Sequence, residues 1–210
     1  MTTSPTPTGR DDRTLRIPLD AAQRALWQAR LNTLAVLTHL GAELDLSGDE
    51  VVRIRLVRSL PAHSGGLGGD AINGATLAAM VDCAVATTGV LLFRGRTCGT
   101  LQLSIDFMKP VRTALPELEC RVVRRTSTLA FVEARLFGHR GALHLKASGI
   151  VCVAKACAGD GESWKSRFLA GTAADADACF LSEPQPGRKA PMALSPVDPN
   201  ACHDPATQAA

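Results

Sequence analysis

The sequence contains no long run of basic residues, no C-x-x-C pair and no apolar stretch at its N-terminus. Its 23 lysine and arginine residues and 20 aspartate and glutamate residues give a net charge of +3, spread along the chain. This distribution gives little support for nucleic-acid binding. Residues 1–13 are polar and rich in threonine and proline, so we expect a disordered lead-in rather than a secretory signal.

The seven cysteines and five histidines show no spacing typical of metal ligands. We therefore assign no metal. An odd number of unpaired cysteines indicates a reduced, cytoplasmic protein in which the thiols are small packing residues. Cys83 is a poor candidate for a nucleophile because the neighbouring Asp82 disfavours its thiolate.

The segment from Ala71 to Phe93 is almost wholly apolar and carries one charged residue, Asp82. It is nearly long enough to span a bilayer, but Gly74 and Gly89 interrupt it and small residues dominate it. We interpret it as a helix buried against a sheet in a soluble protein. A carboxylate on such a helix must be hydrogen-bonded, protonated or used in chemistry, so Asp82 is the first catalytic candidate.

The remaining hydrophobic pattern predicts one more helix and five strands. Asp20 and Gln23 form a capping box that starts an amphipathic helix, and Gly41 ends it. A strand is expected over 52–56, followed by a loop over 61–69 that is rich in glycine and proline. After the long helix, residues alternate between apolar and polar in four strands, with the short connections typical of antiparallel hairpins. These strands cover about 101–107, 118–122, 132–136 and 143–153.

This order of elements predicts an α+β fold. A curved antiparallel sheet wrapped around the long helix is the simplest way to bury a helix that is apolar on nearly all sides. We expect a disordered lead at 1–17, a folded domain with its N-terminal helix at 18–157, and a mostly disordered, proline- and alanine-rich extension at 158–210. Within that extension, Trp164, Phe168 and Leu169 are candidates for a short docking helix.

Two motifs carry a family resemblance: residues 107–110 read Phe-Met-Lys-Pro, and Asn73-Gly74-Ala75 begins the helix that bears Asp82. With the order of elements, they resemble the hotdog-fold acyl-CoA thioesterases of the phenylacetate-pathway (PaaI-like) type over about residues 37–154. In that family a His-Gly-Gly helix start precedes a catalytic Asp or Glu, and the next strand ends in Phe-x-x-Pro. Here Asn73 and Ala75 depart from the first motif, whereas Gly74 and the spacing to Asp82 match it.

The resemblance implies hydrolysis of an acyl-CoA thioester with no cofactor beyond the coenzyme A of the substrate. The implied catalytic set is Asp82, Gly74 and Asn73. The Gly74 N–H at the helix N-terminus would form an oxyanion hole, and Asp82 would act as nucleophile or general base. Asparagine can replace histidine for orienting a group but not for carrying a proton.

Gly74 and Asp82 lie about 12 Å apart along the helix axis. The resemblance implies that they meet across the interface of a homodimer or homotetramer. The acyl group is left open between aryl and medium-chain, because an apolar pocket lined by Leu77, Met80, Leu92 or Phe107 admits both.

Several further residues are candidates for substrate contact. Thr87 and Thr88 can position water or the carboxylate; alternatively a buried threonine bonds its own i−4 carbonyl, which we favour more for Thr87. Asp70 either touches substrate or forms a turn. Cations that suit the phosphates of coenzyme A, or are simply solvated, include Arg94 and Arg112. The predicted substrate-binding set is Asp70, Ala75, Thr87, Thr88, Lys109, Arg124 and Arg125.

The main alternative is a non-catalytic acyl-CoA-binding hotdog protein, in which the aspartate is masked by a fixed hydrogen bond or the groove is closed. A hotdog dehydratase would need an Asp and His pair acting on one substrate, and no such pair accompanies the helix start here. A regulator would need an attached DNA-binding module, and the residues before the first strand contain only one good helix. The hypothesis of a purely structural interaction protein does not explain the spacing between Gly74 and Asp82. We expect neither nucleic acid nor membrane as a partner.

Overall fold

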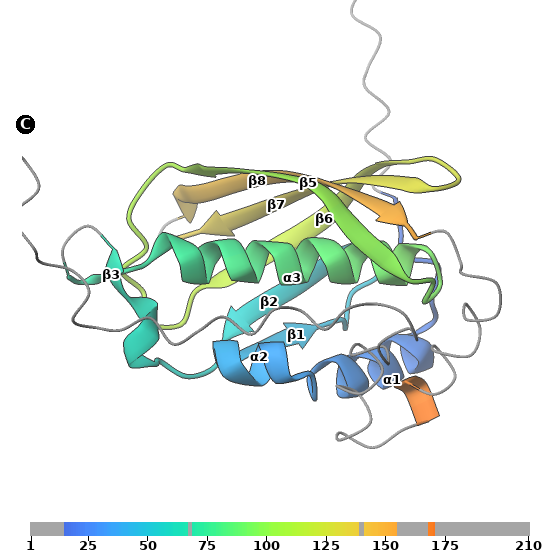
Figure 1. The fold of residues 1–210 in the computed structure, drawn as a ribbon, viewed down its shortest axis with the longest axis horizontal. Helices are drawn as coiled ribbons and strands as arrows, with labels where there is room; N and C mark the ends of the chain where they lie inside the picture. Colours follow the sequence, from blue (N-terminus) through green and yellow to red (C-terminus); the bar gives the residue numbers. More distant parts are fainter. Residues whose placement is uncertain (1–14, 67–68, 139–140, 155–167, 171–210) are drawn as a thin grey trace, which may run out of the picture. The chain divides into compact units, whose positions relative to one another are not determined.

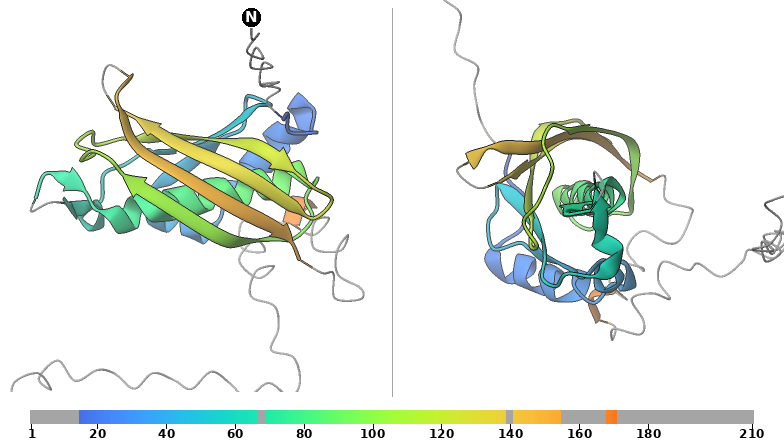
Figure 2. Two further views of the ribbon diagram at one scale, coloured as in Figure 1. Left: turned by 90° about the horizontal axis from the view of Figure 1, so that it is seen from above. Right: turned by 90° about the vertical axis from the view of Figure 1, so that its left-hand side faces the viewer.

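The structure is a computed structural model that describes residues 15–66, 69–138, 141–154 and 168–170. Six strands form one antiparallel sheet in the order β1-β2-β6-β7-β8-β5. A 19-residue helix, α3 (Gly74–Leu92), lies along the sheet, which curls around it (Figures 1 and 2). This confirms the predicted α+β hotdog fold. The strands are β1 (Ala42–Asp45), β2 (Val51–Leu56), β5 (Cys98–Phe107), β6 (Glu117–Arg125), β7 (Leu129–Phe137) and β8 (Leu143–Val153).

The N-terminal helix predicted between Asp20 and Gly41 is two helices, α1 (Ala21–Leu31) and α2 (Ala35–Leu40). The capping box at Asp20 and the left-handed Gly41 at the end are both present, so the outer limits are confirmed. The break occurs at Asn32, whose side chain donates to the Leu44 carbonyl at 3.0 Å and accepts from the Leu44 N–H at 2.8 Å. These bonds to β1 divert the chain from continuing the helix.

Two small strand pairs were not predicted. Strand β1 pairs with β2 in a register that sets Ala42 opposite Leu56. Within the expected loop, a 3₁₀ turn η1 (Pro61–His63) leads into β3 (Ser64–Gly66), which pairs with β4 (Ala71–Ile72) next to the start of α3 (Figure 1). Backbone pairing this short leaves no hydrophobic period in the sequence.

The core lies between the sheet and the inner face of α3. Glycine permits the close approach: a Cβ on Gly89 of α3 would lie 2.3 Å from Cγ1 of Val151. Likewise, a Cβ on Gly149 of β8 would lie 2.8 Å from Cγ1 of Val85. Helix α3 is long and apolar enough to cross a membrane, but 61% of its most apolar window is buried inside the fold. It is therefore a core helix.

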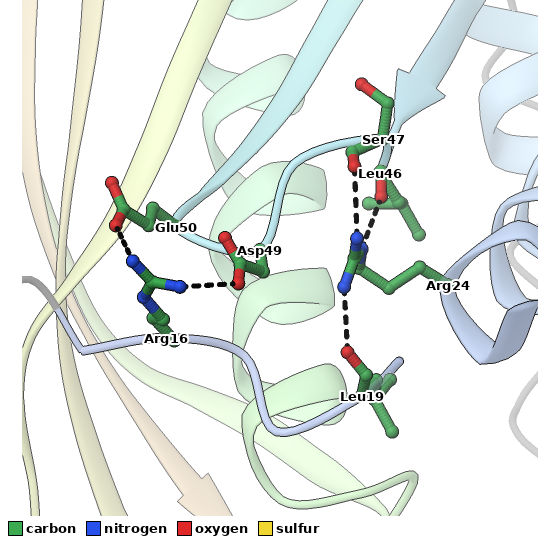
Figure 3. Close-up of polar contacts among 7 residues, drawn as sticks. All are labelled: Arg16, Leu19, Arg24, Leu46, Ser47, Asp49 and Glu50. Atoms are coloured by element: carbon green, nitrogen blue, oxygen red, sulfur yellow. Dashed lines mark hydrogen bonds and ion pairs between the residues drawn. The ribbon is translucent and has the colours of Figure 1, made fainter. Parts of the chain in front are cut away.

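Arginine side chains fasten the N-terminal segment to the turn between β1 and β2 (Figure 3). Arg16 forms ion pairs with Asp49 at 3.3 Å and Glu50 at 3.2 Å. The Arg24 guanidinium donates hydrogen bonds to three backbone carbonyls, so its role is structural. The accepting residues are Leu19, Leu46 and Ser47.

Part of the predicted docking helix is present as a helical turn at residues 168–170. The Phe168 ring packs 5.6 Å from the Trp27 ring of α1, and Arg30 donates to the Leu169 carbonyl at 3.1 Å. The predictions for residues 1–14 and for the rest of the 158–210 extension, Trp164 included, lie outside the described residues.

Candidate active site

Asn73 caps the N-terminus of α3 and joins it to the preceding residues 62–64. Its Oδ1 accepts from the Thr76 N–H at 2.8 Å. Its Nδ2 donates to the carbonyls of Ala62 and Ser64 at 2.5 and 3.1 Å. Its backbone N–H donates to the His63 carbonyl at 2.8 Å. Asn73 therefore orients the helix start, which is the role that asparagine can share with histidine.

The N–H groups of Gly74 and Ala75 follow directly and have no acceptor among the described residues. Both residues are exposed. They are two of the four N–H groups that a helix start cannot satisfy internally, and they stand at the positive end of the helix dipole. This pair is available to a carbonyl oxygen or an oxyanion.

A pocket of about 350 Å³ opens beside Gly74. The Phe-x-x-Pro segment forms one wall, with the Phe107 ring 3.5 Å from the point where a Gly74 Cβ would lie. Leu77 and Phe107 line the pocket as expected. Met80 and Leu92 do not, because they are 0% and 2% exposed in the core. The lining residues are Ala71, Ile72, Gly74, Leu77, Phe107, Met108, Lys109, Pro110 and Val111.

Asp82 lies on the face of α3 that the sheet leaves uncovered, and its side chain is exposed. It makes no hydrogen bond or ion pair within the described parts of the chain, and it does not line the Gly74 pocket. The same face carries Ala75, Ala79 and Ala86, which are exposed or half-buried. A single chain therefore separates Asp82 from Gly74 by about 12 Å of helix.

Burial, together with the charge of Asp82, raises the pKa of the adjacent Cys83 to about 11. The thiol is neutral near pH 7, which agrees with the expectation that Cys83 is not a nucleophile.

The two threonines beyond Asp82 face the interior. Thr88 is 1% exposed, and its hydroxyl donates to the Ala84 carbonyl at 2.7 Å. The hydrogen bond from a threonine hydroxyl to its own i−4 carbonyl therefore forms at Thr88, whereas the sequence analysis had favoured this bond more at Thr87. Thr87 is 7% exposed. Neither lines the pocket at Gly74, so their predicted contact with substrate stays a prediction.

The candidate cations fall at two ends of α3. Lys109 lines the Gly74 pocket, and Arg112 forms an ion pair with Asp70 at 2.8 Å close by. Arg124 and Arg125 end β6 near the C-terminus of α3, where the Arg125 guanidinium lies 5.9 Å from the centroid of the Phe93 ring. One chain therefore does not bring all of its predicted phosphate ligands together.

His63 is a site residue that the sequence analysis missed. It is 4% exposed, and its Nδ1 accepts from the Leu60 N–H at 3.2 Å. Its Nε2 consequently carries the proton and donates to the Leu40 carbonyl at 2.9 Å. The ring ties the 3₁₀ turn that holds Asn73 to the end of α2. No sequence spacing could have revealed it, because its partners are backbone groups.

The described residues contain no group of three or more His, Cys, Asp or Glu side chains placed to hold a metal ion. The groups that line or adjoin the Gly74 pocket are two backbone N–H donors, the Lys109 side chain and apolar walls.

Comparison with known proteins relates part of the chain to one family. The thioesterase superfamily profile matches residues 69–143, from the loop before α3 to the start of β8. No curated protein sequence matches the chain.

Solved structures with a similar fold include proteins named as thioesterases. A Haemophilus influenzae thioesterase has a TM-score of 0.55 at 13% identity, covering 65% of this chain and 92% of that one. The E. coli PaaI protein of the phenylacetic acid degradation operon has a TM-score of 0.54 at 17% identity, with coverage of 64% and 94%. Zebrafish thioesterase superfamily member 2 has a TM-score of 0.53 at 15% identity, with coverage of 65% and 99%. Residues 69–143 thus match the thioesterase superfamily, and the chain has the fold of these thioesterase and PaaI structures.

Proposed function

We propose that the protein hydrolyses aryl- or medium-chain acyl-CoA thioesters to the free acid and coenzyme A. The observation that carries this proposal is an apolar pocket beside two N–H groups at the start of α3 that have no acceptor among the described residues. The apolar walls suit an acyl group, and the N–H pair suits its carbonyl oxygen. The pocket sets no sharp limit on the acyl group, so aryl and medium-chain esters are both proposed.

In this mechanism the thioester carbonyl oxygen accepts hydrogen bonds from Gly74 and Ala75. Negative charge develops on that oxygen in the transition state, and one such donor is worth about 3 kcal/mol in hydrolases. Asp82 then acts in one of two ways. As a nucleophile it forms an acyl anhydride and expels the coenzyme A thiolate, after which water hydrolyses the anhydride. As a general base it takes a proton from the water that attacks the carbonyl.

The Asp82 that serves one Gly74 pocket belongs, in this proposal, to a second copy of the chain. Strand β5 is a ten-residue edge strand, and two of its apolar side chains, Leu101 and Phe107, are 65% and 54% exposed. An uncovered antiparallel edge offers N–H and C=O groups to another strand. The small-residue face of α3 that bears Asp82 is likewise uncovered. A second copy on this side covers both surfaces, and dimer and tetramer both remain compatible with it.

The alternative, a non-catalytic acyl-CoA-binding protein, requires a masked aspartate or a closed groove. Asp82 is exposed and makes no hydrogen bond within the described residues, and the Gly74 pocket is open. These two observations favour the enzyme.

The test is the release of free thiol from a panel of short, medium, long and aryl acyl-CoAs, with the parent chain beside Asp82→Asn. Glu43→Gln, which alters an exposed carboxylate on β1, is the matched control. We expect turnover of aryl or medium-chain esters that Asp82→Asn abolishes and Glu43→Gln retains. Equal rates for the parent and Asp82→Asn would refute the mechanism. Saturable binding without thiol release would instead support the binding protein.

A further inference from the structure

We propose that a second, polar cleft beside the Gly74 pocket holds a phosphate of the coenzyme A nucleotide on Arg112, and that Asp70 competes with this phosphate. The inference rests on the proposed function, because it assigns the far end of the same substrate. The cleft has a volume of about 170 Å³. Its lining residues are Ser59, His63, Ser64, Asp70, Ala71, Ile72, Arg112, Thr113 and Ala114.

The two clefts adjoin along β4. Ala71 and Ile72 line both of them, so this two-residue strand is their common wall. Asp70 precedes Gly74 by four residues, which span at most about 14 Å of extended chain. The polar cleft is therefore within reach of an extended ligand arm whose thioester lies at Gly74.

One segment supplies a cation to each cleft. The Ile72 N–H donates to the Val111 carbonyl at 2.8 Å, which fixes the segment alongside β4, and Val111 itself is buried. Lys109, two residues before Val111, lines the apolar pocket, and Arg112, directly after it, lines the polar cleft. A ligand that crosses β4 meets a positive charge on both sides.

Arg112 is only partly used by the protein. Its Nε donates to Asp70 Oδ2 at 2.8 Å, and its two Nη nitrogens have no partner among the described residues. By contrast, Arg53 is paired with Glu117 and Glu119, and Arg24 is held by three carbonyls. The terminal fork of Arg112 is thus available for two parallel bonds to a phosphate.

The Asp70 carboxylate is a weak internal competitor. The side chains of Arg112 and Asp70 are 57% and 71% exposed, and ion pairs this open to water contribute little stability. A phosphate that carries more charge and three acceptor oxygens can displace the carboxylate from the guanidinium. The cleft is also lined by Ser59, Ser64 and Thr113, whose hydroxyls can donate to the remaining oxygens.

The variants Arg112→Gln and Asp70→Asn test the subsite, and Arg55→Gln, which removes an exposed arginine paired with Glu43 on β1, is the matched control. Each is assayed with one acyl-CoA and with the N-acetylcysteamine thioester of the same acid, which lacks the nucleotide. Arg112→Gln should raise the KM for acyl-CoA about tenfold relative to that for the short ester, since it removes charge-assisted bonds. Asp70→Asn should lower the KM for acyl-CoA, and Arg55→Gln should change neither substrate.

Calorimetric titration of coenzyme A, dephospho-coenzyme A and pantetheine separates the possible outcomes. A loss of affinity on Arg112→Gln for coenzyme A alone assigns the 3′-phosphate to the cleft. An equal loss for dephospho-coenzyme A assigns the pyrophosphate. An identical effect of Arg112→Gln on all three ligands and on both esters, or none on any, overturns the inference. If the parent hydrolyses neither ester but binds coenzyme A through Arg112, the subsite stands and the proposed hydrolysis fails.

Discussion

At the residue scale, Asn73 makes most of the polar contacts that hold the start of α3. Its amide nitrogen holds the carbonyls on either side of His63, and its amide oxygen caps α3. Gly74 and Ala75 follow directly, so the direction of their N–H groups depends on the position of Asn73. The departure from histidine is therefore compatible with an orienting role at this position.

The variant Asn73→Asp tests that role. Aspartate remains a good N-cap but turns two donated bonds into contacts between a carboxylate and carbonyls. We expect kcat for acyl-CoA to fall about tenfold with little change in KM, because the oxyanion contact belongs to the transition state. Asp20→Asn, the reverse exchange at the cap of α1, should leave both constants unaltered. An unchanged kcat in Asn73→Asp would show that the cap does not position the site.

At the scale of elements, two glycines of α3 have different roles: Gly89 allows close packing against the sheet, and Gly74 adjoins the pocket. Gly89 is needed for packing, because an added Cβ would lie 2.3 Å from Val151, and helix and sheet would have to separate. Gly74 lies at a pocket, where an added Cβ would make an ordinary 3.5 Å contact with the Phe107 ring. The same substitution should therefore have opposite consequences at the two ends of the helix.

Gly89→Ala should lower the free energy of unfolding by about 1–3 kcal/mol, as overpacking of a core does. Gly74→Ala should retain the parent's stability but lose activity, because its methyl group occupies the space beside the oxyanion donors. Chemical denaturation and thiol release measured on both variants check this pair. A stable Gly89→Ala, or a fully active Gly74→Ala, would contradict the assignment concerned.

The elements that sequence predicted correctly are those with a hydrophobic period or a capping side chain. The capping box at Asp20, the long helix and the four later strands belong to this class. The split at Asn32 and strand β1 were missed, because each depends on a bond between segments distant in sequence. In the candidate site, Gly74 and Asp82 were proposed from the helix-start motif and its family resemblance, and their roles stay predictions. His63 and the Asp70–Arg112 pair could not be predicted, because they depend on tertiary contacts.

At the scale of the whole molecule, the buried thiols make stability depend on pH. Burial raises the pKa of Cys120 to about 12 and that of Cys98 to about 11, against an ordinary value of 9.0. Between pH 9 and these raised pKa values, the thiols stay protonated in the folded chain but lose their protons in the unfolded chain. Their contribution to the free energy of unfolding is therefore fully present below pH 9 and declines above it.

Raising the pH from 8 to 10 should cost about 1.4 kcal/mol of unfolding free energy through Cys120 alone. Cys120→Ala should be less stable than the parent at pH 8, because it leaves a small cavity, but should lose less stability on going to pH 10. Urea unfolding of both proteins at the two pH values measures the difference. Parallel losses in the parent and Cys120→Ala would contradict this account.

The proposed mechanism requires an assembly, because one chain keeps Asp82 and the Gly74 pocket apart. Leu101→Lys places a charge on the uncovered β5 edge. We expect it to shift the protein to monomers in analytical ultracentrifugation and to abolish turnover with the fold intact. Arg16→Lys, on the exposed N-terminal segment, should leave the assembly unchanged. An active Leu101→Lys monomer would show that one chain is sufficient.

The most direct test of the central claim is the thiol-release rate of hybrid assemblies made from Asp82→Asn and Gly74→Val chains. Each variant alone should be inactive, one lacking the carboxylate and the other having a blocked pocket. A hybrid dimer contains one intact site, so an equal, freely exchanged mixture should recover about a quarter of the parent rate. No recovery from a mixture shown to contain hybrids, or full activity of Asp82→Asn alone, would contradict a thioesterase site shared between two chains.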